Sequence, residues 1–124
     1  MTTHLVLNKA YLLQNKPIVR NLIAALVEVT ERINSDKTAA ALILNGQLKQ
    51  ETGKALKDEV IQRAMARVEF TWDPIGPSLE KSAQAAHRVG FLKTAPALSG
   101  IYSLGLLNDV LKEKNLPPVQ EVTP

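Results

Sequence analysis

Apolar side chains between residues 17 and 34 recur every three or four positions, which is the spacing of one face of an α-helix. Pro17 suits the first turn of such a helix, because the N–H group that proline lacks would have no partner there. A second stripe of Val19, Ile23 and Val27 widens the apolar face. The pattern therefore predicts a helix over residues 17–34 that other parts of the protein cover on more than one side.

Turn and cap residues divide the remaining helical pattern into further segments. Residues 34–36, Asn-Ser-Asp, supply a turn and an N-cap for a second helix that ends near Gly53. Gly90 is well placed as the left-handed residue that closes a later helix. Three more segments have helical periodicity: residues 57–67, 78–88 and 104–114. The chain is thus predicted to be mainly helical.

Two short segments differ from this pattern and have the character of β-strands. Residues 4–7, His-Leu-Val-Leu, fit either a buried strand or the lead-in to a helix. Residues 68–72, Val-Glu-Phe-Thr-Trp, alternate and are rich in β-branched and aromatic side chains, which favours a strand. Residues 73–77 contain two prolines and a glycine and end it. Because two strands that pair only with each other form a marginal sheet, both segments are expected to be edge pieces of a larger sheet supplied from elsewhere.

Composition narrows the classes of protein that fit. At 124 residues, with 45% hydrophobic and 22% charged side chains, the chain has the size and balance of one globular domain. The absence of cysteine excludes a disulfide scaffold, thiolate-bound zinc, iron–sulfur clusters and a cysteine nucleophile. The net charge of +3 comes from scattered basic residues without a Lys/Arg run, so no nucleic-acid partner is predicted. No segment has the ~20 apolar residues of a membrane-spanning helix, and the first residues lack the pattern of a secretory signal.

Side chains that could carry chemistry are few and have structural explanations. His4 and His87 are the only histidines and lack a metal-ligand spacing, and His87 lies where the carboxyl end of a helix favours a cation. Asp73 opens an Asp-Pro turn. Trp72 could stack on a ligand or pin a strand to a helix, with the second favoured, and Tyr102 is expected to pack with its hydroxyl hydrogen-bonded. No nucleotide-binding glycine loop or Gly-x-Ser-x-Gly sequence is present, so we expect no enzyme, no cofactor and no metal site.

Two segments near the carboxyl end resemble a known family. They are residues 68–92, Val-Glu-Phe-Thr-Trp-Asp-Pro-Ile-Gly-Pro-Ser-Leu-Glu-Lys-Ser-Ala-Gln-Ala-Ala-His-Arg-Val-Gly-Phe-Leu, and residues 98–111, Leu-Ser-Gly-Ile-Tyr-Ser-Leu-Gly-Leu-Leu-Asn-Asp-Val-Leu. Both are similar to the carboxyl-terminal part of the aliphatic sulfonate, taurine and nitrate substrate-binding proteins of ABC importers. The earlier segments resemble the same family in the same order.

The resemblance implies a periplasmic or lipid-anchored receptor whose two α/β lobes close on a small anionic or organosulfur ligand and deliver it to an ABC permease. This chain would be one partial domain, residues 1–124, of that periplasmic-binding-protein-like α/β fold, mainly α with one or two short β-strands. Its parts would be a crossover strand and short helix at 1–16, helices at 17–67, a strand at 68–72, helices at 77–115 and a loose, polar tail at 116–124. The export signal and most ligand contacts would lie in a preceding part. Of this chain, only Thr2, Thr3 and His4, in the crossover region, would lie near the ligand.

A second interpretation is a free-standing helical interaction module that binds no ligand and buries its uncovered apolar surface by self-association. Under either interpretation the isolated chain is expected to form homo-oligomers, because exposed sheet edges and apolar faces favour pairing. The choice among a sulfonate, taurine, nitrate and a pyrimidine as ligand stays open.

Overall fold

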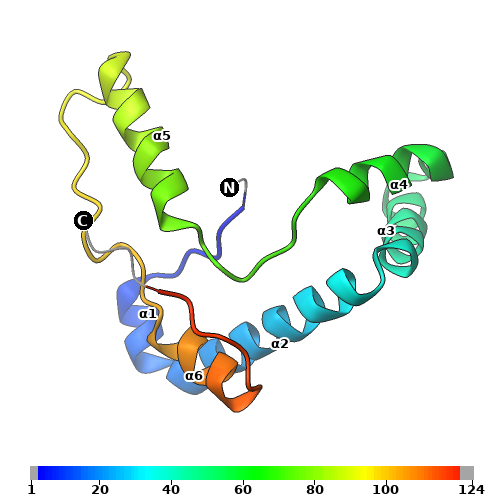
Figure 1. Ribbon diagram of the computed structural model, residues 1–124, viewed down its shortest axis with the longest axis horizontal. Coiled ribbons are helices and arrows are strands. Elements are labelled where there is room, and N and C mark those ends of the chain that lie inside the picture. Colours follow the sequence, from blue (N-terminus) through cyan, green and yellow to red (C-terminus); the bar gives the residue numbers. More distant parts are fainter. Residues whose placement is uncertain (1–2, 121–124) are drawn as a thin grey trace. The chain divides into compact units, whose positions relative to one another are not determined.

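The computed structural model describes residues 3–120, which form six α-helices joined by turns and extended segments (Figure 1). The helices are α1 (Lys9–Gln14), α2 (Lys16–Ser35), α3 (Lys37–Thr52), α4 (Asp58–Arg67), α5 (Gly76–Arg88) and α6 (Gly105–Glu113). The chain divides into two compact units. Unit 2 comprises Ala25–Trp72, and unit 1 comprises the residues before Ala25 together with those after Trp72.

The positions of the helices confirm the periodicity of the sequence. The helices predicted at 17–34, 57–67, 78–88 and 104–114 are α2, α4, α5 and α6, and their ends differ from the prediction by no more than two residues. The predicted caps are also present. Asp36 Oδ1 accepts a hydrogen bond from the N–H group of Ala39 at 2.8 Å, at the start of α3. Gly53 and Gly90 have φ angles of 75° and 82°, in the left-handed region that glycine enters without strain.

The predicted strands are wrong. Residues 3–120 are 63% helix and contain no strand or sheet, so they do not form the periplasmic-binding-protein-like α/β lobe that the resemblance implied. Residues 4–7 are the lead-in to α1, which was the second possibility for that segment. Residues 68–72 follow α4 in a non-helical conformation. A strand exists only through ladder hydrogen bonds with a neighbouring strand, and neither segment has such a neighbour within the described residues.

After α4, side chains of unit 2 form the hydrogen bonds to the backbone that a neighbouring strand would form in a sheet. Val68 is extended, with φ −101° and ψ 131°, and its carbonyl oxygen accepts a hydrogen bond from Lys37 Nζ at 3.0 Å. The Phe70 carbonyl accepts one from Asn34 Nδ2 at 2.9 Å. Alternate residues of an extended segment point their backbone groups to the same side. The end of α2 and the start of α3 therefore satisfy carbonyl groups that a neighbouring strand would otherwise bind.

Unit 2 is organised around α3 and α4, which pack against each other. Its core consists of Ala41, Ile61 and Met65, each no more than 5% exposed. Asn45 is buried in the same unit. The Asn45 amide oxygen accepts from the Leu56 N–H group at 2.8 Å, and its Nδ2 donates to the Leu56 carbonyl at 2.9 Å. These two bonds hold the loop between the helices against α3.

Unit 1 buries one face of α6 together with parts of the segments on either side of it. The buried apolar side chains of this unit are Val19, Leu104, Leu107, Val110, Leu111 and Val119. Arg20, in the first half of α2, forms an ion pair with Glu113 at the end of α6. Both side chains are more than one-third exposed, so the pair contributes little beyond orienting the two helix segments.

The segment after α6 turns back and is held to that helix. Asn115 has a φ of 57°, and the Leu116 N–H group donates to the Leu111 carbonyl at 2.8 Å, which is the long hydrogen bond of a Schellman motif. Asn108 bonds to both backbone groups of Val119, at 2.9 and 3.0 Å. The tail was expected to be loose, but over its described part it is fixed by these bonds.

Large apolar side chains are exposed in both units. Val6 is 82% exposed and Phe91 is 85% exposed. One row of exposed side chains follows a single face of α2: Ile18, Leu22, Leu26 and Val29. The wide apolar face predicted for this helix is therefore only partly covered within the described residues. No helix in residues 3–120 is both long enough and apolar enough to cross a membrane.

Candidate functional site

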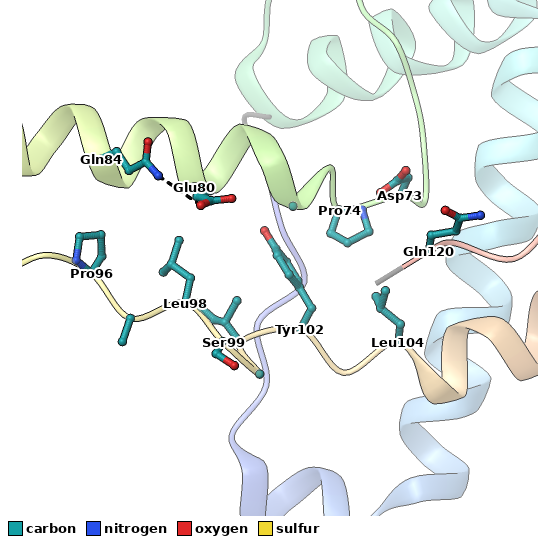
Figure 2. Close-up of a pocket in the computed structure, with 14 residues that line it drawn as sticks. Asp73, Pro74, Glu80, Gln84, Pro96, Leu98, Ser99, Tyr102, Leu104 and Gln120 are labelled. Carbon is teal, nitrogen blue, oxygen red and sulfur yellow. Dashed lines mark hydrogen bonds between the residues drawn. The ribbon is translucent and has the colours of Figure 1, made fainter. Parts of the chain in front are cut away.

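A groove of about 470 Å³ lies in unit 1 between the beginning of α5 and the segment that leads into α6 (Figure 2). Residues 73–76 and α5 form one wall, residues 96–104 form the other, and Gln120 lies at one end. Glu80 and Gln84 project from α5 toward the opposite wall in Figure 2. Because its volume falls in the range of small-molecule pockets, this groove is the candidate functional site.

The turn before α5 positions the first wall. Asp73 Oδ1 accepts a hydrogen bond from the Ile75 N–H group at 2.7 Å, the local turn that an Asp-Pro sequence favours. Ile75 has a φ of 51°, which a β-branched residue rarely adopts. Such a conformation costs about 1–3 kcal/mol and persists only where the surroundings fix it. Pro77 then lies in the first turn of α5, where its missing N–H group is tolerated.

His4 connects the amino-terminal segment to both walls. Its Nε2 lies 3.1 Å from the Pro74 carbonyl oxygen and 3.3 Å from the Tyr102 hydroxyl oxygen. Because a carbonyl group can only accept, the bond to Pro74 requires the proton on Nε2, and the Tyr102 oxygen then accepts from the same N–H group. The histidine and tyrosine rings have centroids 6.0 Å apart. Residues from distant parts of the sequence therefore meet beside the groove.

The Tyr102 hydroxyl is a lining group whose acidity is altered by its surroundings. Burial raises its pKa above the ordinary value of 10.0, and the negative charge of Asp73 raises it further. Both effects disfavour the phenolate. At neutral pH the Tyr102 hydroxyl is therefore an uncharged hydrogen-bonding group in the groove wall.

The lining of the groove carries negative charge. Among the described residues that line it, Asp73 and Glu80 are the two carboxylates, and none is Lys, Arg or His. Glu80 Oε1 accepts a hydrogen bond from Gln84 Nε2 at 3.2 Å. A small anion in the groove would be repelled by these two negative charges. The groove itself is therefore unsuited to the sulfonate or nitrate that the resemblance implies.

The residues predicted to lie near a ligand have different positions. Thr2 lies outside the described residues, and Thr3 is exposed. His4 is half-buried and contacts the groove walls as described above. His87 is exposed in the last turn of α5, as predicted. The sequence predicted a hydrogen-bonded hydroxyl for Tyr102, but no local pattern indicated that His4 would be its neighbour.

Within the described residues, no group of three or more His, Cys, Asp or Glu side chains could hold a metal ion. Comparison with known proteins gives no assignment either: no protein family, curated protein or solved structure matches this chain. The resemblance to the importer receptors therefore stays a prediction.

Proposed function

We propose that this chain is the carboxyl-terminal part of a solute-binding protein that delivers a small anion or organosulfur compound to an ABC permease. The ligand class is an aliphatic sulfonate, taurine or nitrate, and the receptor works in the periplasm without catalysing a reaction. The observation that carries the proposal is the similarity of residues 68–92 and 98–111 to that family.

Two features of the described residues support a role within a larger protein. Large apolar side chains are exposed on helices of both units, and such surface commonly marks contact with another polypeptide. Residues 68–72 have the composition of a strand but lack a strand partner. The groove of unit 1 has no part in this proposal, because its carboxylates repel an anion.

The gene offers the first test. We expect the reading frame to continue upstream of the Met1 codon into an export signal and a further lobe, beside genes for an importer ATPase and a permease. Calorimetric titration of the complete gene product with taurine, ethanesulfonate and nitrate should show saturable binding of at least one. If no coding sequence precedes Met1 and no importer gene lies nearby, the proposal is wrong.

The histidines provide a matched pair of variants in that complete gene product. We expect the anion to replace Pro74 and Tyr102 as acceptor of the Nε2–H hydrogen bond of His4. His4→Ala should then weaken binding of the preferred anion by about tenfold, the loss expected for one hydrogen bond to a charged group. His87→Ala changes the other histidine, which is exposed at the end of α5, and should leave the affinity unchanged. Equal effects of the two substitutions would remove His4 from the ligand site.

The exposed row on α2 favours a second candidate function, a free-standing helical module that self-associates and binds no ligand. Ile18, Leu22, Leu26 and Val29 are each more than 40% exposed and lie on one helical face, which a second copy could cover. Sedimentation velocity should then show a species heavier than the 13.6 kDa chain at micromolar concentration. A single 13.6 kDa species with a cooperative thermal transition would contradict this candidate.

A further inference from the structure

The groove of unit 1 combines apolar walls with a charged side that the proposed function does not use. Pro96 and Leu98 lie on the wall opposite α5, and the Tyr102 ring stands between that wall and Glu80 (Figure 2). Leu104, which is 6% exposed, closes the groove toward α6. An occupant would therefore meet hydrocarbon on one side and a carboxylate on the other.

The charge of the lining selects among occupants. Glu80 is half-buried, and the single bond that it accepts from Gln84 leaves the carboxylate with further acceptor sites. Asp73 adds a second negative charge, and no basic side chain of residues 3–120 lines the groove. An anion would be repelled, and a neutral molecule would leave the charge of Glu80 without a counter-charge. A cation is complementary to the lining.

The size and the walls define the rest of the occupant. A volume of about 470 Å³ suits a small molecule. A tyrosine ring attracts an ammonium group placed over its face, and Pro96 and Leu98 favour contact with an aliphatic chain. We propose that this groove binds a small aliphatic amine in its ammonium form, with the nitrogen between Glu80 and Tyr102 and the hydrocarbon against Leu98. This site is independent of the proposed import function.

The test uses three probes of equal chain length on the ¹⁵N-labelled chain: n-butylammonium chloride, butan-1-ol and sodium butane-1-sulfonate. We expect butylammonium to shift the backbone amide resonances of Gly100, Ile101 and Tyr102, with a dissociation constant on the order of millimolar. Butan-1-ol should bind more weakly, and butane-1-sulfonate should not shift these resonances. Added sodium chloride should weaken the binding of butylammonium more than that of butan-1-ol, because only the first is electrostatic.

Glu80→Gln removes the charge and keeps the shape of the side chain. It should weaken butylammonium binding about three- to tenfold, the range expected for a partly exposed charge-assisted contact. Glu28→Gln is the matched control, because Glu28 is exposed on α2 and does not line the groove. The proposal is overturned if butane-1-sulfonate binds as well as butylammonium, if both variants behave alike, or if no probe shifts the groove amides in a saturable way. The effect of sodium chloride on butylammonium binding to the wild-type chain tests the electrostatic contact without any substitution.

Discussion

In each unit an asparagine on a helix binds the segment that follows that helix, but the two asparagine side chains are buried to different degrees. In unit 2, Asn45 bonds to both backbone groups of Leu56 and is only 7% exposed. In unit 1, Asn108 bonds to both backbone groups of Val119 and is half-buried. Removing the Asn45 side chain would leave an empty space in a buried position, whereas water already reaches part of the Asn108 side chain. The same hydrogen-bond pattern should therefore contribute more stability in unit 2.

The two units also turn the chain with different residues. The left-handed position after α3 is Gly53, with φ 75°, and the one after α6 is Asn115, with φ 57°. Glycine accepts this conformation without a steric penalty, and asparagine tolerates it better than most other residues. A similar arrangement is therefore built from two different sequences, and each turn has its own sensitivity to substitution.

The largest expected effects come from the cores and test whether the units are separate. Leu111→Ala should destabilise unit 1 by about 3 kcal/mol, and Met65→Ala should destabilise unit 2 by about 2–3 kcal/mol, because each leaves a cavity among buried side chains. Amide hydrogen exchange, measured residue by residue, should show lost protection mainly in the unit that carries the substitution. Equal loss in both units from either variant would show that the division does not describe how the chain unfolds.

The asparagines give the next largest effect and address the comparison directly. Asn45→Ala should cost about 2 kcal/mol, because it breaks both bonds to Leu56 and leaves a cavity where a side chain that is only 7% exposed was packed. Asn108→Ala should cost about 1 kcal/mol, because its side chain is only half-buried and water can fill the place that it leaves. Urea unfolding followed by circular dichroism measures both. If Asn108→Ala is the more harmful substitution, burial depth is not what distinguishes the two sites.

Smaller effects are expected at the left-handed turns. Gly53→Ala should destabilise the chain by about 1 kcal/mol, because a Cβ atom strains this conformation. Asn115→Gly should change stability by no more than about 0.5 kcal/mol, since relief of strain in the folded state is opposed by greater freedom in the unfolded chain. Thermal unfolding of the two variants beside the wild type decides this. A large loss for Asn115→Gly would mean that the asparagine side chain does more than tolerate the turn.

The smallest expected effect is a pH dependence confined to unit 1, which contains both tyrosines. In the Tyr11→Phe variant, tyrosinate absorbance reports Tyr102 alone, and its midpoint should lie above that of the same variant unfolded in guanidinium chloride. Since the folded-state pKa is raised, the stability that this group contributes is complete below pH 10 and is lost as the pH rises through the folded-state value.

Asp73→Asn serves as the control for that titration. It should lower the midpoint only in part, because burial is the larger cause of the shift and the Asp73 charge is the smaller one. Asparagine also keeps an oxygen that can accept the Ile75 N–H bond, so the turn before α5 is preserved. If the Tyr11→Phe variant with Asp73 intact has the same midpoint folded and unfolded, both causes are contradicted.

The candidate site was only partly predictable. The Asp-Pro turn at Asp73 and the start of α5 follow from local preferences of these residues, and the sequence predicted both. The contacts of His4 with Pro74 and Tyr102 join residues far apart in the chain, and no spacing or periodicity signals such a meeting. The Asn45 and Asn108 bonds were missed for the same reason, because each asparagine binds a segment that comes after the next turn of the chain.

The sequence by itself determined the helices and their caps, because periodicity, N-cap chemistry and left-handed glycine act over a few neighbouring residues. It also indicated that residues 68–72 would not be helical, and Val68, the first of them, is extended. Only the tertiary structure decided that this segment is not a strand. A strand requires a partner from a distant part of a polypeptide, and in the described residues the side chains of Lys37 and Asn34 bind its carbonyl groups instead.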